Sequence, residues 1–257
     1  MKFTRAIVRQ PGKNFASGLT TSGLGLPTLE KTLAQHAAYC HALEQCGLEL
    51  RHLEPDENYP DGTFVEDTAV LTAECAVLTR PGAASRQGES GLMLPVLESF
   101  YEQIYTITAP GSLEGGDICQ ADRRFLIGVS ERTNPEGACQ LAGFLKRHGY
   151  TSSIIDTRVI PGLLHLKSGI AYLGDGNLAV IPALADHPDL QAYKKILVHD
   201  EEGYAANCVR VNDNVLAVAG FPRFHDSLLQ RGYRVLALEV SEFQKMDGGL
   251  SCLSLRF

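Results

Sequence analysis

The sequence lacks the features that mark several common classes of protein. Its 257 residues carry a formal net charge of −7, so there is no excess of positive charge for binding nucleic acid or an anionic membrane. No stretch approaches the roughly 18 apolar residues of a membrane span, and the first residues contain no apolar core of signal-peptide length. We therefore expect a cytoplasmic protein that binds neither nucleic acid nor a membrane.

Several chemical motifs are also missing. The seven cysteines are odd in number and contain no CxxC pair, which argues against a disulfide framework and a paired-cysteine zinc site. The chain has no GxSxG, HExxH or GxxxxGK[ST] motif. We expect free and mostly inert thiols, and a protein that requires no metal, nucleotide or other cofactor.

What the sequence does contain is a repeat in pattern. Five segments begin with a polar residue that leads into an alternating apolar stretch, and four of them turn and return as a second stretch. The segments begin at Glu66, Glu114, His165, Asn207 and Cys252, about 42 to 51 residues apart. Such a period is typical of one supersecondary unit repeated around an axis.

Turn and helix signals complete each unit. Turn residues at 121–124, 174–177 and 212–214 predict hairpins. A helix is expected from the N-cap Asn134 to Gly149, because proline follows the cap and glycine lies past the end. The same signals, proline at the start and glycine past the end, predict helices over 27–47 and 222–232. Short strands are expected at 48–53, 151–155 and 234–238.

The two ends of the chain complement each other in this pattern. The segment that begins at Cys252 has no return stretch, while the strand at 3–9 has no partner. We expect the N-terminal strand to complete the fifth unit, which also removes an exposed sheet edge. The sequence therefore predicts one domain over residues 1–257.

The residues at the five starting positions are chemically informative. Convergence on a common axis would bring together a thiol, an imidazole and several carboxylates, with Asp67 and Asp117 added to them. A thiolate is a nucleophile, a histidine transfers protons, and a carboxylate can orient the imidazole. The surplus carboxylates call for a cation, and a planar guanidinium matches them best.

At this point the sequence resembles a known family. The runs GluGlyGlyAsp at 114–117, HisLeuLysSer at 165–168 and AspGlyGlyLeuSerCys at 247–252 are similar to motifs of guanidine-modifying enzymes. The runs at 61–67, 80–86 and 132–134 narrow the resemblance to the dimethylarginine dimethylaminohydrolases. It extends over the whole chain and implies an α/β fold of the pentein type, a five-bladed pseudo-symmetric αβ propeller of repeating ββαβ units.

The resemblance also implies roles for individual residues. Cys252 would attack the guanidinium carbon, His165 would protonate the departing amine and then activate water, and Glu114 would orient His165. The implied substrate contacts are Glu66 and Asp67 with the guanidinium, Arg86 and Arg132 with the α-carboxylate, Asp61 and the backbone of Leu19 with the α-amino group, and Met246 at a position occupied by valine in some relatives. Leu19 lies in a glycine-bearing loop that resembles the family's lid.

The implied reaction converts Nω-methylated arginine into citrulline and a methylamine. Two alternatives remain: an arginine deiminase that releases ammonia, and a non-catalytic arginine-binding protein.

Taken singly, Cys252 and His165 would more often be structural, and Arg86 and Arg132 would be solvated surface residues. Asn207 and Asp117 receive no chemical role; Asp117 is expected to serve turn hydrogen bonds. A thiol beside a histidine is also able to bind zinc, which would inhibit it, and the oligomeric state, including a homodimer, is left open.

Overall fold

The computed structural model describes residues 2–257, and the chain divides into two compact units. Unit 1 comprises Met1–Val65 and Val198–Phe257, and unit 2 comprises Glu66–Leu197. The single domain expected from the sequence stays a prediction.

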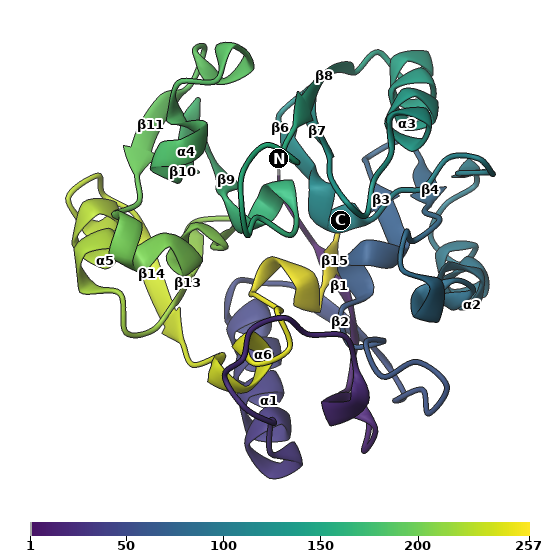
Figure 1. The fold of residues 1–257 in the computed structure, drawn as a ribbon, viewed down its shortest axis with the longest axis horizontal. Helices are drawn as coiled ribbons and strands as arrows, with labels where there is room; N and C mark the ends of the chain where they lie inside the picture. The colour runs from purple at the N-terminus through teal and green to yellow at the C-terminus, as the bar shows by residue number, and fades with distance from the viewer. Residues whose placement is uncertain (1) are drawn as a thin grey trace. The chain divides into compact units, whose positions relative to one another are not determined.

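Five three-stranded sheets of one design make up the fold (Figure 1). In each sheet the middle strand pairs antiparallel with one neighbour and parallel with the other. Unit 1 contains β15 (Leu255–Arg256), β1 (Arg5–Arg9) and β2 (Glu49–Leu53), and also β12 (Val209–Val211), β13 (Asn214–Val218) and β14 (Arg234–Leu238). Unit 2 contains β3 (Ala69–Leu71), β4 (Ala76–Leu78) and β5 (Ile104–Thr106), then β6 (Ile118–Ala121), β7 (Arg124–Val129) and β8 (Thr151–Asp156), and then β9 (Ile170–Gly174), β10 (Asn177–Val180) and β11 (Lys194–Leu197).

A helix links the middle strand of each sheet to its parallel neighbour, because parallel strands need a crossover connection. The five linking helices are α1 (Leu29–Gln45), α2 (Glu89–Leu97), α3 (Pro135–Arg147), α4 (Pro182–Ala185) and α5 (Pro222–Leu229), and a short α6 (Ser241–Gln244) follows β14. The repeating unit is therefore the ββαβ unit expected from the sequence.

In every sheet, a 3-10 turn precedes the strand that pairs antiparallel with the middle strand. These turns are Val65–Thr68, Gly115–Asp117, Leu166–Ser168, Asp200–Ala206 and Ser251–Leu253. All five residues that begin the sequence repeat lie in one of these turns or directly beside it. The regular spacing in the sequence thus reflects a structural repeat that places candidate site residues at equivalent positions in their sheets.

Local predictions from the sequence are confirmed at several points. Asn134 caps α3, since its Oδ1 accepts a hydrogen bond from the backbone N–H of Gly137 at 2.8 Å. The strand β1 pairs with β15 through Ala6 opposite Arg256, as expected for completion of the fifth unit. Helix α2, which contains Pro95 near its end, was not predicted from the sequence.

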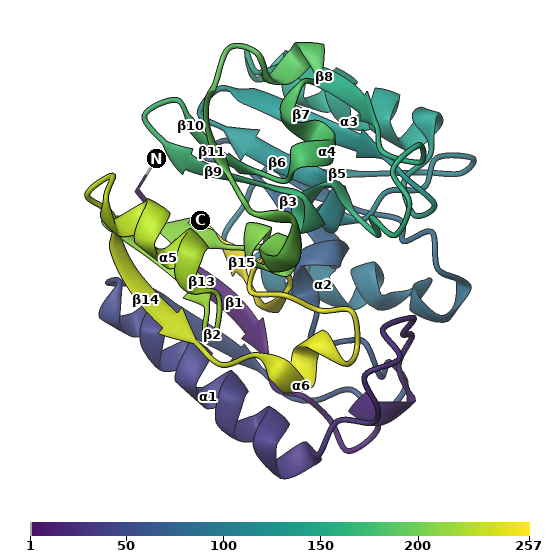
Figure 2. The ribbon, with the colours of Figure 1, turned by 60° about the vertical axis from the view of Figure 1, so that its left-hand side comes forward.

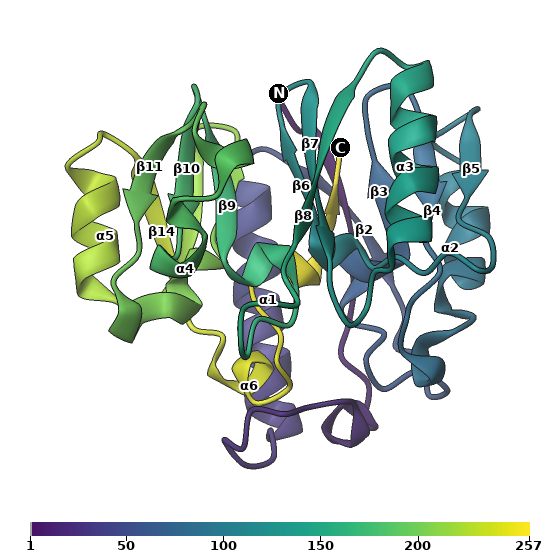
Figure 3. The ribbon, with the colours of Figure 1, turned by 45° about the horizontal axis from the view of Figure 1, so that its top comes forward.

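Each unit has its own apolar core. In unit 1, α1 lies along β2 and β14 (Figure 2) and contributes Tyr39 and Leu43 to a cluster with Phe15 and Phe243. In unit 2, α3 lies alongside β7 and β8 (Figure 3) and packs its buried residues against the sheet. Among the described residues, no helix has the length and apolar character needed to cross a membrane.

Candidate active site

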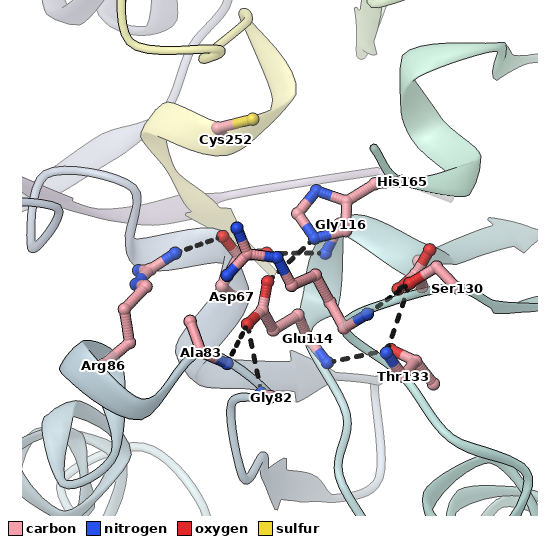
Figure 4. Close-up of polar contacts among 12 residues, drawn as sticks. Asp67, Gly82, Ala83, Arg86, Glu114, Gly116, Ser130, Thr133, His165 and Cys252 are labelled. Carbon is pink, nitrogen blue, oxygen red and sulfur yellow. Dashed lines mark hydrogen bonds and ion pairs between the residues drawn. The ribbon is translucent and has the colours of Figure 1, made fainter. Parts of the chain in front are cut away.

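The predicted proton carrier and its predicted orienting carboxylate lie together in unit 2 (Figure 4). His165 Nε2 is 2.8 Å from Glu114 Oε2. The other oxygen, Oε1, accepts hydrogen bonds from the backbone N–H groups of Gly82 at 3.1 Å and Ala83 at 3.3 Å. The carboxylate therefore has a fixed direction, and it fixes the imidazole in turn.

The imidazole lies closely over the backbone of Gly116, where a Cβ atom would come within 2.6 Å of His165 Nδ1. Only glycine allows this approach, which explains a glycine in the run 114–117.

Charge around His165 favours its protonated form. Burial alone would lower the pKa of His165, but Asp117, Asp67 and Glu114 together raise it to about 9. An imidazole with such a pKa is protonated at neutral pH and is able to act as a general acid.

A buried ion-pair network surrounds the predicted guanidinium-binding carboxylate Asp67. Arg86 Nη1 lies 2.5 Å from Asp67 Oδ2, and Arg86 Nη2 lies 2.7 Å from Glu89 Oε2. Asp67 Oδ1 accepts a hydrogen bond from the Gly116 N–H at 2.8 Å. Burial would raise the pKa of Asp67, but Arg86 and His165 hold it below its usual value.

Two further predicted ligands in unit 2 differ in how they are held. Glu66 Oε1 lies 2.5 Å from Lys167 Nζ, and the side chains of both residues are largely buried. The side chain of Arg132 makes no hydrogen bond or ion pair within residues 2–257, although its backbone N–H donates to Ser130 Oγ at 2.9 Å. Of the two predicted carboxylate ligands, Arg132 is thus free in this structure, whereas Arg86 is paired.

Asp117, for which only turn hydrogen bonds were expected, connects two segments of the site. Its Oδ2 accepts from Ser130 Oγ at 2.7 Å, and its Oδ1 accepts from the backbone N–H of Leu166 at 2.9 Å. It therefore joins the turn that precedes Arg132 to the residue that follows His165. Burial raises the pKa of Asp117 above its usual value.

One oxygen or nitrogen each of Asp67, Glu114 and His165 lie within 4.8 Å of one another, a composition able to hold a metal ion. Both carboxylate oxygens of Asp67 and of Glu114 are already engaged, by Arg86, by backbone N–H groups and by His165 Nε2. The network is therefore balanced by protein cations and donors, and we assign it no metal.

In unit 1, the predicted contacts for the substrate amino group come together. The backbone N–H of Leu19 lies 3.1 and 3.2 Å from the two carboxylate oxygens of the buried Asp61. A Cβ atom at Gly18 would collide with Asp61 Oδ1 and lie 3.3 Å from Met246 Cε. Met246 is buried in the core of unit 1, which places it behind this loop.

The loop that contains Leu19 is fastened to the segment after α6. Thr20 Oγ1 and Ser22 Oγ each donate to the carbonyl oxygen of Lys245 at 2.7 Å, and the N–H of Thr21 donates to Asp247 Oδ2 at 2.5 Å. Asp247 has a φ of 55°, a conformation that aspartate tolerates better than most residues. The predicted lid and the approach to the Cys252 turn are therefore connected by polar contacts.

The predicted nucleophile lies in the turn Ser251–Leu253, which is drawn in yellow in Figure 4. Its N–H donates to the Gly249 carbonyl at 3.2 Å, and its Sγ lies 4.0 Å from Ser251 Oγ.

Cys252 is partly exposed, whereas five of the other six cysteines are buried. Burial raises the pKa of Cys40 to about 12 and that of Cys119 to about 11, so these thiols are poor nucleophiles. Cys139 is exposed on α3.

Comparisons with known proteins show which family the chain belongs to. The family model for arginine deiminase matches residues 53–187. A dimethylarginine dimethylaminohydrolase of Pseudomonas aeruginosa is 43% identical over 256 residues, which cover 99% of this chain and 100% of the relative. The chain belongs to the dimethylarginine dimethylaminohydrolase family. A second such hydrolase, from Streptomyces coelicolor, is 30% identical and covers 100% of this chain and 98% of its own length.

A solved structure extends the similarity to the fold. A cysteine-to-serine variant of the Pseudomonas aeruginosa hydrolase in complex with citrulline has a TM-score of 0.97 and 42% identity, with full coverage of both chains. The predicted fold class, a five-bladed αβ propeller of ββαβ units, is confirmed by this similarity and by the five sheets of one design.

Proposed function

We propose that this protein hydrolyses asymmetric dimethylarginine and monomethylarginine to citrulline and a methylamine. The observation that supports it most directly is the His165–Glu114 pair, in which a buried imidazole is held protonated at neutral pH. A protonated imidazole is what the departure of a poor leaving group such as dimethylamine requires. Membership of the family indicates which reaction is catalysed, and His165 of this pair is the proposed general acid.

The reaction takes two steps through a covalent intermediate. The Cys252 thiolate attacks the guanidinium carbon, and a carbon–sulfur bond forms. The bond from carbon to the dimethylated nitrogen breaks as His165 transfers its proton to that nitrogen, which leaves a thiouronium. Neutral His165 then accepts a proton from water as the water oxygen attacks the same carbon. Collapse of that adduct releases citrulline and the thiolate as the remaining hydroxyl proton passes to solvent, and His165 is left protonated for the next turnover.

The substrate carries groups of both charges, and we propose that residues of the opposite charge bind each of them. Glu66 and Asp67 are the proposed contacts of the substrate guanidinium, and Arg132 and Arg86 those of its carboxylate. Because Arg86 is paired with Asp67 and Glu89 in this structure, its binding to a carboxylate requires the exchange of a partner. Asp61 and the backbone of Leu19 are the proposed contacts of the amino group, and Met246 supports the loop behind them.

Arginine deiminase is the second candidate, because the family model that matches residues 53–187 carries that description. It would use the same nucleophile, acid and carboxylates but release ammonia from arginine. We further propose that the protein acts in the cytoplasm on its small cationic substrate without a cofactor; light scattering of the purified protein measures whether it forms a homodimer.

One assay tests the proposal and separates the candidates. The purified protein is incubated with asymmetric dimethylarginine and, separately, with arginine, and citrulline and the released amine are measured. Citrulline with dimethylamine from the methylated substrate alone is the expected result. Citrulline with ammonia from arginine would establish the deiminase instead, and no citrulline from either substrate would leave arginine binding without catalysis.

A further inference from the structure

Asn207 is in phase with the other site residues of the repeat but has no role in the reaction described above. It lies at the end of the 3-10 turn Asp200–Ala206 and is 6% exposed. Its Oδ1 accepts from the backbone N–H of Ser251 at 2.9 Å, and its Nδ2 donates to Ser251 Oγ at 3.2 Å. Both bonds go to the residue directly before Cys252, so the amide of Asn207 positions the turn that carries the nucleophile.

The packing around Asn207 is close. A Cβ atom at Gly249 would lie within 2.5 Å of Asn207 Cγ. Only glycine, which has no Cβ atom, therefore fits at position 249 beside the side-chain amide of Asn207. The close packing against Asn207 thus explains why the second glycine of the run 247–252, Gly249, is a glycine.

The hydrogen bond from Asn207 also sets the direction in which Ser251 can donate. An amide NH₂ group only donates, so Ser251 Oγ must accept from Asn207 Nδ2. The hydroxyl proton of Ser251 is therefore directed elsewhere, and Cys252 Sγ lies 4.0 Å away. A hydroxyl that donates to sulfur favours the thiolate over the thiol.

Equivalent contacts in unit 2 use carboxylates for the same structural task. Asp67 accepts from the N–H of Gly116, and Asp117 accepts from the N–H of Leu166, each from the following repeat. In unit 1 the acceptor is the neutral Asn207. A carboxylate there would serve the backbone N–H equally well, but it would place negative charge beside a forming thiolate and would lack the donor for Ser251.

We propose that Asn207 is a positioning residue that orients the Ser251 hydroxyl to donate a hydrogen bond to the thiolate of Cys252. The inference rests on the proposed role of Cys252 as nucleophile.

The test measures the thiol directly. In a Cys139→Ser background, the rate of alkylation of Cys252 by iodoacetamide is followed from pH 6 to 10 by mass spectrometry of its peptide. Ser251→Ala removes the hydroxyl but keeps the backbone bond to Asn207, and we expect the apparent pKa of alkylation to rise by about 0.5 to 1 unit. Asn207→Asp keeps the acceptor but loses the donor and adds charge, so its rise should be larger.

Asn212→Asp is the matched control. Asn212 lies in the same unit and makes three side-chain hydrogen bonds, to both backbone groups of Phe3 and to the carbonyl of Cys46. The same chemical change there should leave the alkylation profile unchanged. Ser251→Thr, which retains a hydroxyl, should restore a profile close to that of the parent protein.

An unchanged profile for Ser251→Ala would overturn the inference, as would an equal shift for Asn212→Asp. If Asn207→Asp does not fold, as judged by thermal unfolding, the comparison of Ser251→Ala with Ser251→Thr decides the question alone. Because alkylation needs no substrate, a shifted profile in a protein that forms no citrulline would uphold the inference and reject the proposed function.

Discussion

The two units hold their candidate site residues by different physical means. In unit 2 nearly every such side chain is a buried charge paired with another charge, as in Arg86 with Asp67 and Lys167 with Glu66. In unit 1 the Cys252 turn is held by a neutral amide and a hydroxyl, and Asp61 is the one charged residue among the predicted contacts. Removing a partner in unit 2 leaves a buried charge uncompensated, whereas in unit 1 it removes ordinary hydrogen bonds.

Because of this difference, we expect substitutions in the two units to change different properties of the protein. Substitutions in unit 2 should alter stability together with binding and proton transfer, because the same charges serve both. Substitutions at the nucleophile turn of unit 1 should alter chemistry with little effect on stability.

The largest expected effect follows from Cys252→Ser. Loss of the thiolate should lower citrulline formation by at least about a thousandfold, because a serine hydroxyl is a far weaker nucleophile at neutral pH. Binding of substrate, measured by calorimetry, and the thermal unfolding midpoint should change little. Cys139→Ser on α3 is the control and should retain full activity. Turnover that survives in Cys252→Ser would remove this residue as nucleophile.

Next in size is the loss of stability in Arg86→Ala. It leaves the buried Asp67 and Glu89 without their cation and should cost about 3 to 5 kcal/mol in the free energy of unfolding. Arg158 forms an ion pair with Asp156 in which both side chains are about half exposed, so Arg158→Ala should lower the free energy of unfolding far less than Arg86→Ala does. Equal losses in urea unfolding of the two variants would contradict the expectation that a buried charge left without its partner costs more than an exposed one.

The raised pKa of His165 predicts a pH-dependent stability. The folded protein binds the His165 proton more tightly than the unfolded chain, whose histidine has the ordinary pKa of 6.5. Its stabilisation is therefore complete below pH 6.5 and is lost as pH rises towards about 9. Unfolding free energies measured across this window should fall by up to about 1.4 kcal/mol per pH unit from this group.

The same experiment on His165→Gln isolates the contribution of this group. The slope between pH 6.5 and 9 should flatten in this variant and persist in His187→Gln, which changes a partly exposed histidine. An identical slope in the parent protein and in His165→Gln would show that the carboxylates do not hold the proton.

The smallest effect should come from Arg132→Ala. Its guanidinium makes no hydrogen bond or ion pair in the part of the chain that the structure describes, so unfolding should change by less than about 1 kcal/mol. Loss of the proposed carboxylate contact should raise KM about tenfold with a smaller change in kcat. Steady-state kinetics that are unchanged in both Arg132→Ala and Arg86→Ala would refute the proposed carboxylate contacts.

Much of the fold could be predicted from the sequence because its signals are local. The cap at Asn134, the turn residues Asp122, Asp175 and Asn212 with φ of 54–55°, and the apolar alternation of the strands all act within a few residues. The pairing of β1 with β15 is long-range, yet it could be predicted because one strand and one unit each lacked a partner.

The sequence predicts which residues belong to the candidate site, but it indicates only some of the pairs that they form. The repeat identified Glu114 and His165, and the structure brings them together. The engagement of Arg86 by Glu89, of Glu66 by Lys167 and of Ser251 by Asn207 had no signal in the sequence that distinguishes these partners from other polar residues. Such pairs depend on side-chain directions in the folded state, which periodicity does not encode.

The pairing of β1 with β15 also determines the order in which the protein can fold during its synthesis. Unit 2 is one continuous stretch, Glu66–Leu197, and can assemble as soon as that stretch has left the ribosome. Unit 1 must wait, because β1 finds its antiparallel neighbour only when Leu255 and Arg256 have been made. The turn that carries Cys252 is synthesised after every residue of the His165 network, and we expect it to reach its place after that network has formed.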